Sequence, residues 1–134
     1  MALVILTREP ERPPVAVPPP MCPGLVTTGG KPVGPDSLAG QPGTAVEGRV
    51  SVESVPANEG FWTACGQTRV WVRLVGAGES PGAIAPGATL NLRGVAARHE
   101  PGFAGGQGVD PAEGAAELDG QGFHVEVIYG DLRR

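Results

Sequence analysis

Hydrophobic and polar positions alternate most clearly in the part of the chain that follows residue 43. Val46, Val50 and Val52 are separated by charged or small polar residues. A period of two is typical of a strand with one buried face. The alternating segments, each bounded by turn residues such as Gly, Pro and Asn, predict five strands. They cover residues 44–55, 61–65, 68–75, 88–98 and 123–129.

Two details within this pattern lead to further expectations. Gly94 interrupts the fourth predicted strand, where it suggests a bulge or a tight bend. Residues 99–122 form a long link before the fifth strand, and a link of that length is usually functional or mobile. One short helix is expected within it, because Asp110 suits the N-cap, Pro111 the first helical position and Glu113 a capping box.

The first 43 residues have a different composition. Ten of the 15 prolines lie in residues 1–42. Each proline fixes φ and biases the preceding residue toward extended backbone. We therefore predict a proline- and glycine-rich extended arm over residues 1–43, a boundary near Gly43, and a separate domain over residues 44–134. The arm is expected to add little to the stability of that domain.

The first residues give an expectation about the compartment. The apolar residues 2–6 lack a basic start, a sufficiently long apolar region and a cleavage site, so they do not resemble a secretory signal. We expect a short strand or an exposed apolar end, with a trimmed targeting segment as the alternative. No run approaches the roughly 18 apolar residues of a membrane helix. A cytoplasmic location is slightly favoured.

Five short strands and a long link before the last one predict an all-β protein, a small five-stranded barrel that leaves no exposed edges. Residues 44–130 resemble the OB-fold, in small stand-alone form. The motifs that carry the resemblance are Val-Glu-Gly-Arg-Val at 46–50, Gly-Phe-Trp at 60–62, Arg-Val-Trp-Val-Arg at 69–73, Ala-Pro-Gly at 85–87 and Leu-Asn-Leu-Arg-Gly-Val at 90–95. The helix often found between the third and fourth strands of that fold is missing. The resemblance implies a binding surface on the second and third strands.

One face of the third predicted strand carries Arg69, Trp71 and Arg73. An aromatic ring between two cations suits stacked bases and phosphates. Phe61 or Trp62 on the second strand is expected to extend this surface. Arg93 and Arg98, on the fourth strand and at its end, are expected to add positive charge. Alternatively, the indole of Trp71 lies under the proline-rich arm, and the arginines pair with Glu47 or Glu53. The opposite face carries the residues expected in the core: Val70, Val72 and Leu74.

Several apparent catalytic or ligand motifs do not fit their chemistry. Residues 78–82 match the G-x-S-x-G nucleophile elbow, but Pro81 removes the N–H next to Ser80, where an oxyanion donor is needed. Val-Gly-Ala-Gly at 75–78 with Gly82 has the wrong spacing for a dinucleotide fingerprint. Glu113 and Glu117 show no sign of the burial that acid–base catalysis requires. We therefore expect no enzyme.

The chain has few residues that bind metals. His99 and His124 are its only histidines, Cys22 and Cys65 its only cysteines, and no C-x-x-C pair is present. We expect no metal and no cofactor. His124 should face solvent or a neighbouring strand. A disulfide that joins the arm to the barrel and two free thiols are both consistent with the sequence.

These observations predict a non-enzymatic accessory binding or assembly module. It would contact a protein partner or larger complex through its arm, through the face of its second and third strands, or through both. The alternative is binding of single-stranded nucleic acid through Arg69, Trp71 and Arg73. The net charge of −4 belongs entirely to residues 44–134, which disfavours the alternative because proteins that coat nucleic acid are normally basic.

Overall fold

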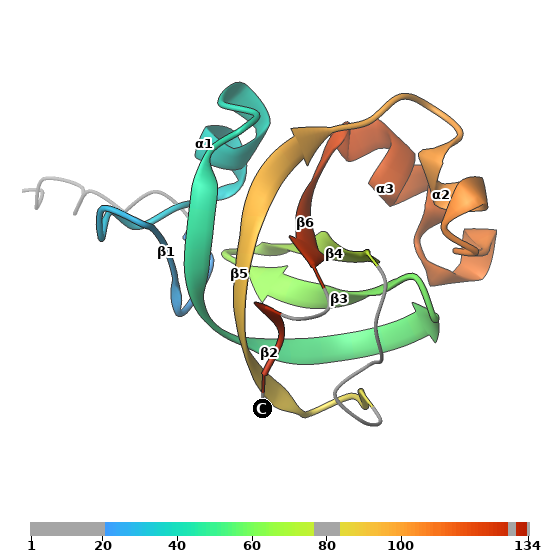
Figure 1. The fold of residues 1–134 in the computed structure, drawn as a ribbon. Coiled ribbons are helices and arrows are strands. Elements are labelled where there is room, and N and C mark those ends of the chain that lie inside the picture. The colour runs from blue at the N-terminus through green and yellow to red at the C-terminus, as the bar shows by residue number, and fades with distance from the viewer. Residues whose placement is uncertain (1–20, 77–83, 129–130, 134) are drawn as a thin grey trace, which may run out of the picture.

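The computed structural model describes residues 21–76, 84–128 and 131–133. Five strands form a closed barrel (Figure 1), in which β5 pairs again with β2. Its order is β2-β3-β4-β6-β5, and neighbouring strands are antiparallel except for the parallel pair β4–β6. The barrel strands are β2 (Ala45–Ala57), β3 (Gly60–Cys65), β4 (Thr68–Val75), β5 (Thr89–Arg98) and β6 (Phe123–Ile128).

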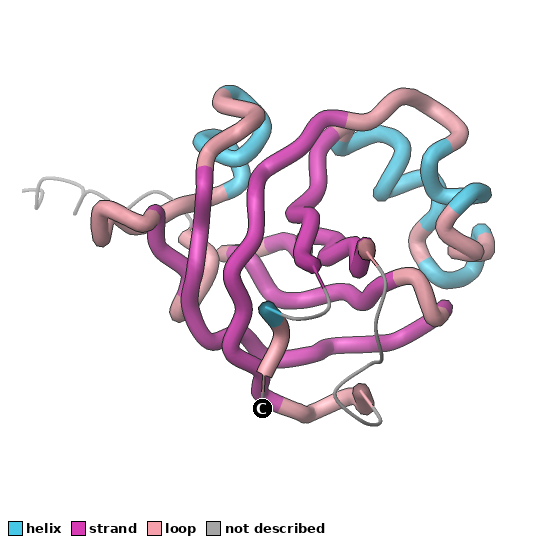
Figure 2. The backbone as a smooth tube through the Cα atoms, viewed as in Figure 1, coloured by secondary structure: helices cyan, strands magenta, loops and turns pink. Residues whose placement is uncertain are grey.

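The prediction of an all-β barrel is confirmed, and the five strands lie within two residues of their predicted bounds. Figure 2 traces how the strand segments curve around one interior. Val70, Val72 and Leu74 are 0%, 1% and 8% exposed and belong to the main hydrophobic core. Alternation along β4 therefore identified the residues that point into the barrel.

Gly94 lies in β5 without a bulge, because its pairing continues to Val46 on one side and to Val127 on the other. A Cβ atom at this position would lie 2.6 Å from the carbonyl oxygen of Glu126. The glycine is needed for the close approach of β6 to β5. Of the bulge and the tight bend that the sequence suggested, the bulge is wrong, and the glycine instead allows a close backbone contact.

Residues 21–43 differ from a purely extended arm. They contain a sixth strand, β1 (Leu25–Thr27), which pairs with β2, and a helix, α1 (Pro35–Gly40). Leu25, Val33 and Leu38 are buried in the same core as the barrel strands. This burial argues against the expectation that residues 21–43 add little to stability. Residues 1–20 lie outside the described residues.

A disulfide joins the N-terminal segment to the barrel. Cys22 is bonded to Cys65 at the end of β3, across a sequence separation of 43 residues. Both half-cystines are buried, at 3% and 0% exposure. Of the two alternatives that the sequence left open, the structure has the bonded one. A covalent link at this place holds β1 and α1 against the barrel.

The long link between β5 and β6 folds into short helical segments. These are α2 (Phe103–Gly106), the 3-10 turn η2 (Pro111–Glu113) and α3 (Ala115–Gln121). The predicted capping residues begin η2, because the Asp110 N–H donates to Glu113 Oε1 at 3.1 Å. The turn ends at Gly114, with φ +107°, so the predicted capping residues begin a single 3-10 turn, and α3 follows it directly. Within the described ranges, the structure has no helix that is both long and apolar enough to cross a membrane.

Candidate functional site

The face of β3 and β4 that the sequence singled out carries both tryptophans. Trp62 and Trp71 are paired in register, and their rings meet edge to face with centroids 5.4 Å apart. Both side chains are fully buried, at 0% exposure. The interpretation of Trp71 as an exposed or arm-covered contact residue is therefore wrong. Strand β4 is buried on both of its faces.

Residues 103–121, called the cap below, cover the two indoles. Ala104, Val109 and Leu118 form a second hydrophobic cluster with the tryptophans, apart from the barrel core. In Figure 1 the cap is the orange-to-red group of helices at one end of the barrel, and α1 lies at the other side of the molecule. A base has no access to either ring in this arrangement.

Both indole N–H groups donate hydrogen bonds to the cap. Trp62 Nε1 donates to the carbonyl oxygen of Glu113 at 3.0 Å, and Trp71 Nε1 donates to Gln107 Oε1 at 2.9 Å. Gln107 is only 5% exposed, so its amide oxygen is held inside the protein. A buried donor left without a partner costs about 1–3 kcal/mol. These two bonds fix the cap in register over β3 and β4.

Arg69 lies at the rim of the cap and is already paired. Its guanidinium contacts the carboxylate of Glu117 at 3.0 Å and lies 4.2 Å from the ring centroid of Trp62. Gln121 Nε2 also donates to the backbone oxygen of Arg69 at 2.7 Å. Glu117 thus neutralises the cation that we expected to bind phosphate.

Arg73 belongs to a second polar group at the other end of the strand. Its Nη1 lies 2.9 Å from Glu126 Oε2, and its guanidinium carbon is 5.8 Å from the ring centroid of Phe103. His124 Nε2 contacts the same carboxylate oxygen at 3.0 Å. The ring of His124 is only 1% exposed and lies against His99, at the end of the neighbouring strand.

The environment shifts the pKa of two groups here. Burial lowers the pKa of His124 below its ordinary value, although the nearby Glu126 carboxylate acts in the opposite direction. Burial raises the pKa of Glu126, but the hydrogen bonds from His124 and Arg73 outweigh it and lower that pKa overall. Glu126 is therefore an ionised acceptor, and the neutral form of His124 is favoured.

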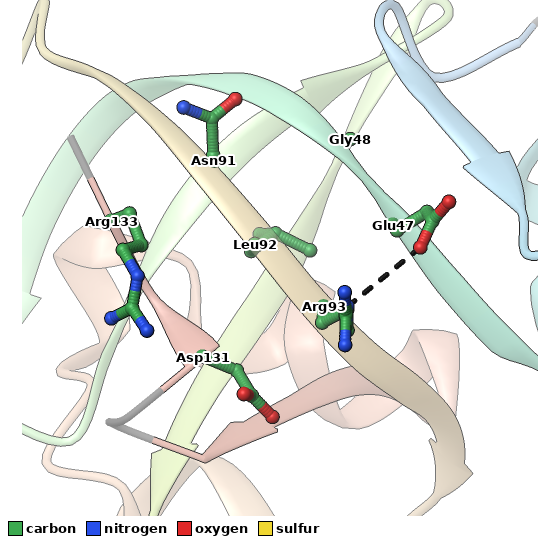
Figure 3. A pocket seen from close by; sticks show the side chains of 7 residues that line it. All are labelled: Glu47, Gly48, Asn91, Leu92, Arg93, Asp131 and Arg133. Atoms are coloured by element: carbon green, nitrogen blue, oxygen red, sulfur yellow. Dashed lines mark ion pairs between the residues drawn. The ribbon is translucent and has the colours of Figure 1, made fainter.

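Arg93 does not join the other predicted site residues. It lies on β5 beside a surface hollow of about 370 Å³, and its Nε is 3.8 Å from Glu47 Oε1. Figure 3 shows Arg93 directed toward Glu47, with Asp131 and Arg133 on the other side of the strand. The alternative pairing with Glu47 thus holds for Arg93, whereas Arg69 and Arg73 have other partners. The hollow is lined by Glu47, Gly48, Asn91, Leu92, Arg93, Asp131 and Arg133.

Two other kinds of site that the sequence analysis considered are a nucleophilic serine and a metal centre. Ser80 and most of the glycine-rich stretch around it lie outside the described residues. Within the parts of the chain that the structure describes, no group of three or more His, Cys, Asp or Glu side chains is arranged to hold a metal ion.

Sequence reasoning missed the cap contacts of Gln107, Val109 and Leu118. The available signal was that Val109 and Leu118 are large apolar residues inside a stretch dominated by glycine and acidic residues. Such residues need a buried surface to pack against. In the structure that surface is the pair of indoles, Trp62 and Trp71.

Comparison with known proteins adds no relative. No protein-family model matches the chain, and neither a curated protein sequence nor a solved structure is detectably similar to it.

Proposed function

We propose that this chain is a non-enzymatic, OB-fold-like binding or assembly module that contacts a protein partner at its capped end. The observation that carries the proposal is that an acidic segment of the chain itself covers the β3–β4 face. A role for the N-terminal arm in the same contact stays a prediction, because residues 1–20 lie outside the described residues.

The strand order supports the resemblance on which this proposal rests. Counting the barrel strands alone, the third and fifth are parallel neighbours, and the fourth closes the barrel against the first. This is the order of the OB-fold, in which the second and third strands and the loop before the last strand form the usual ligand surface. In this chain that loop is the segment that contains the cap.

The charge distribution favours a protein partner over nucleic acid. Residues 99–122 carry five acidic side chains and neither lysine nor arginine. The remaining residues after Gly43 carry seven basic and six acidic side chains, so residues 99–122 account for the whole negative charge of this region. A phosphate backbone is repelled by such a surface, whereas a basic protein surface is attracted to it.

Binding of single strands to the indoles would require the cap to open. Two bases stacked on Trp62 and Trp71 contribute roughly 2–6 kcal/mol. Exposing Leu118 and Val109 costs roughly 3–6 kcal/mol, and the two indole hydrogen bonds contribute about 1 kcal/mol each. The stacking gain is therefore offset by the contacts that must be broken, and the nucleic-acid alternative is disfavoured.

A titration with mixed-sequence oligonucleotides tests that alternative directly. Tryptophan fluorescence at low salt should not respond, because neither indole is accessible. Quenching that weakens as salt rises and is lost in Arg69→Gln would favour the nucleic-acid function instead. The exposed arginine variant Arg49→Gln is the matched control for a general change in charge.

Site-specific photo-crosslinking tests the protein partner. A photoreactive residue is placed at exposed Ala116 on α3, and the control is placed at exposed Asp36 on α1. In an extract of the source cells, the cap position should give a discrete protein adduct that decreases at high salt, because an acidic contact is screened. Equal adducts at both positions, or none at Ala116, would contradict a partner at the capped end.

A further inference from the structure

A continuous chain of hydrogen bonds connects the cap to the barrel through the two histidines. His99 Nε2 lies 2.7 Å from the carbonyl oxygen of Leu118 on α3. The Nδ1 atoms of His99 and His124 are 2.9 Å apart, and His124 Nε2 lies 3.0 Å from Glu126 Oε2. The ring of Phe103 is stacked on both imidazoles, at centroid distances of 4.2 and 4.5 Å.

The hydrogen bonds of this series need more N–H groups than two neutral imidazole rings carry. The Leu118 carbonyl oxygen and the ionised Glu126 carboxylate are acceptors only, so each contact at the two ends needs an N–H from a histidine. The contact between the two Nδ1 atoms needs a third N–H. Two neutral imidazoles carry two N–H groups in total, so they complete only two of the three hydrogen bonds.

We propose that the His99–His124 pair binds one shared proton in excess of its neutral form, and that this proton acts as a pH-dependent latch between cap and barrel. With three protons, all three hydrogen bonds form at once. With two, one of them is lost. The latch closes the cap over the indoles, so its state determines how firmly the β3–β4 face is covered.

The contacts of each ring indicate which of the four ring nitrogens carry the three protons. Because burial lowers the pKa of His124, its neutral Nε2–H tautomer donates to Glu126 and accepts at Nδ1. In the form with three protons, the other two N–H groups belong to His99, which donates one to Nδ1 of His124 and the other to the carbonyl oxygen of Leu118. The charged side chains that interact with His124 are Glu126 on β6 and Arg73 on β4. The cap contributes a carbonyl from α3 and the ring of Phe103 from α2.

The pH dependence has two limbs. As pH rises and the pair loses its third proton, one hydrogen bond breaks and the cap loosens. As pH falls, His124 must take a fourth proton. Its folded-state pKa is below the ordinary value of 6.5, so the open state binds more protons in this range. The contribution of neutral His124 to closure of the cap is therefore complete above pH 6.5 and is lost as the pH falls below that value. The cap should be held most firmly at an intermediate pH, because the pair titrates in two steps.

Histidine side-chain nitrogen NMR on the full chain reads the proton count directly. In the form with three protons, His124 should show the signature of an Nε2–H tautomer and His99 that of a ring protonated at both nitrogens. Two neutral rings at every pH at which the protein is folded would overturn the proposal. This measurement needs no variant.

Hydrogen exchange of the Trp62 and Trp71 indoles reads the latch itself. After correction for intrinsic exchange, protection should pass through a maximum and fall about 2- to 10-fold as the third proton is lost, which corresponds to one hydrogen bond. His99→Gln should abolish the alkaline limb, and the neighbouring exposed control Glu100→Gln should retain it. A protection profile that is flat with pH, or one that His99→Gln leaves unchanged, would refute the latch.

Discussion

Truncating Leu118 to alanine tests whether the cap is a separately stabilised layer over the indoles. The side chain is 0% exposed and belongs to the second cluster, with Val109, Trp62 and Trp71. Removing a buried leucine costs about 2–5 kcal/mol, because the lost transfer energy is added to that of a cavity. This cluster is small, so the loss should appear as local opening of the cap before the barrel unfolds.

The measurable consequence is faster exchange of the two indole N–H groups. A loss of 2 kcal/mol corresponds to about a 30-fold faster exchange through local opening. Exchange of the backbone amides of β2 and β5 should change much less. The assay is hydrogen exchange followed by NMR at fixed pH, together with urea unfolding to report global stability.

Leu90→Ala is the matched control, because Leu90 is 1% exposed in the main barrel core. It should lower the midpoint of global unfolding and accelerate the indoles only as far as the barrel amides. If Leu118→Ala leaves the indoles as protected as in the unmodified chain, the cap does not shield them in the way described. The argument against nucleic-acid binding would then fail as well.

Three further predictions concern the N-terminal segment and the cap turn. Reduction of the Cys22–Cys65 disulfide should lower the free energy of unfolding by about 4 kcal/mol, from the closure of a 43-residue loop; a urea midpoint unaffected by reductant would contradict the bond. A chain that begins at Thr44, with Cys65→Ala, lacks three buried aliphatic side chains, so its free energy of unfolding should be lower by roughly 5–9 kcal/mol. A melting temperature equal to that of the reduced full chain would show that residues 21–43 are dispensable. Gly114→Ala should destabilise more than Gly102→Ala by urea unfolding, because both have φ near +100° but only at Gly114 would a Cβ lie 3.0 Å from Cζ2 of the buried Trp62 ring; equal losses would show that only the backbone strain matters.

The strands were predictable because their alternation is local. Val46, Val50 and Val52 fix one face of β2, and turn residues fix its ends, so the sequence needs no distant information. The same reasoning failed for Trp71. Period two states which side chains share a face, but it does not state what covers that face. Strand β4 has the barrel core on one side and the cap on the other, and only the tertiary arrangement reveals the second layer.

The cap could not be predicted as helical from its composition. Gly105 and Gly106 lie within α2, and Gly120 lies within α3. Each costs about 1 kcal/mol relative to alanine in a helix. Helices this short are unstable alone. Their order comes from distant contacts: Phe103 on the two histidines, and Leu118 on the two indoles.

The segment before the barrel was misjudged for a related physical reason. Leu25, Val33 and Leu38 have no regular spacing, so they produce no periodic signal, yet all three reach the core. A local signal for α1 was present, since Pro35 suits the first turn and the Ser37 hydroxyl accepts the Gly34 N–H at 3.0 Å. What brings this segment to the barrel is non-local, namely the pairing of β1 with β2 and the covalent bond from Cys22. The strand pairing and the disulfide both join residues at least 19 positions apart. Reasoning from the periodicity and turn signals of neighbouring residues therefore cannot predict them.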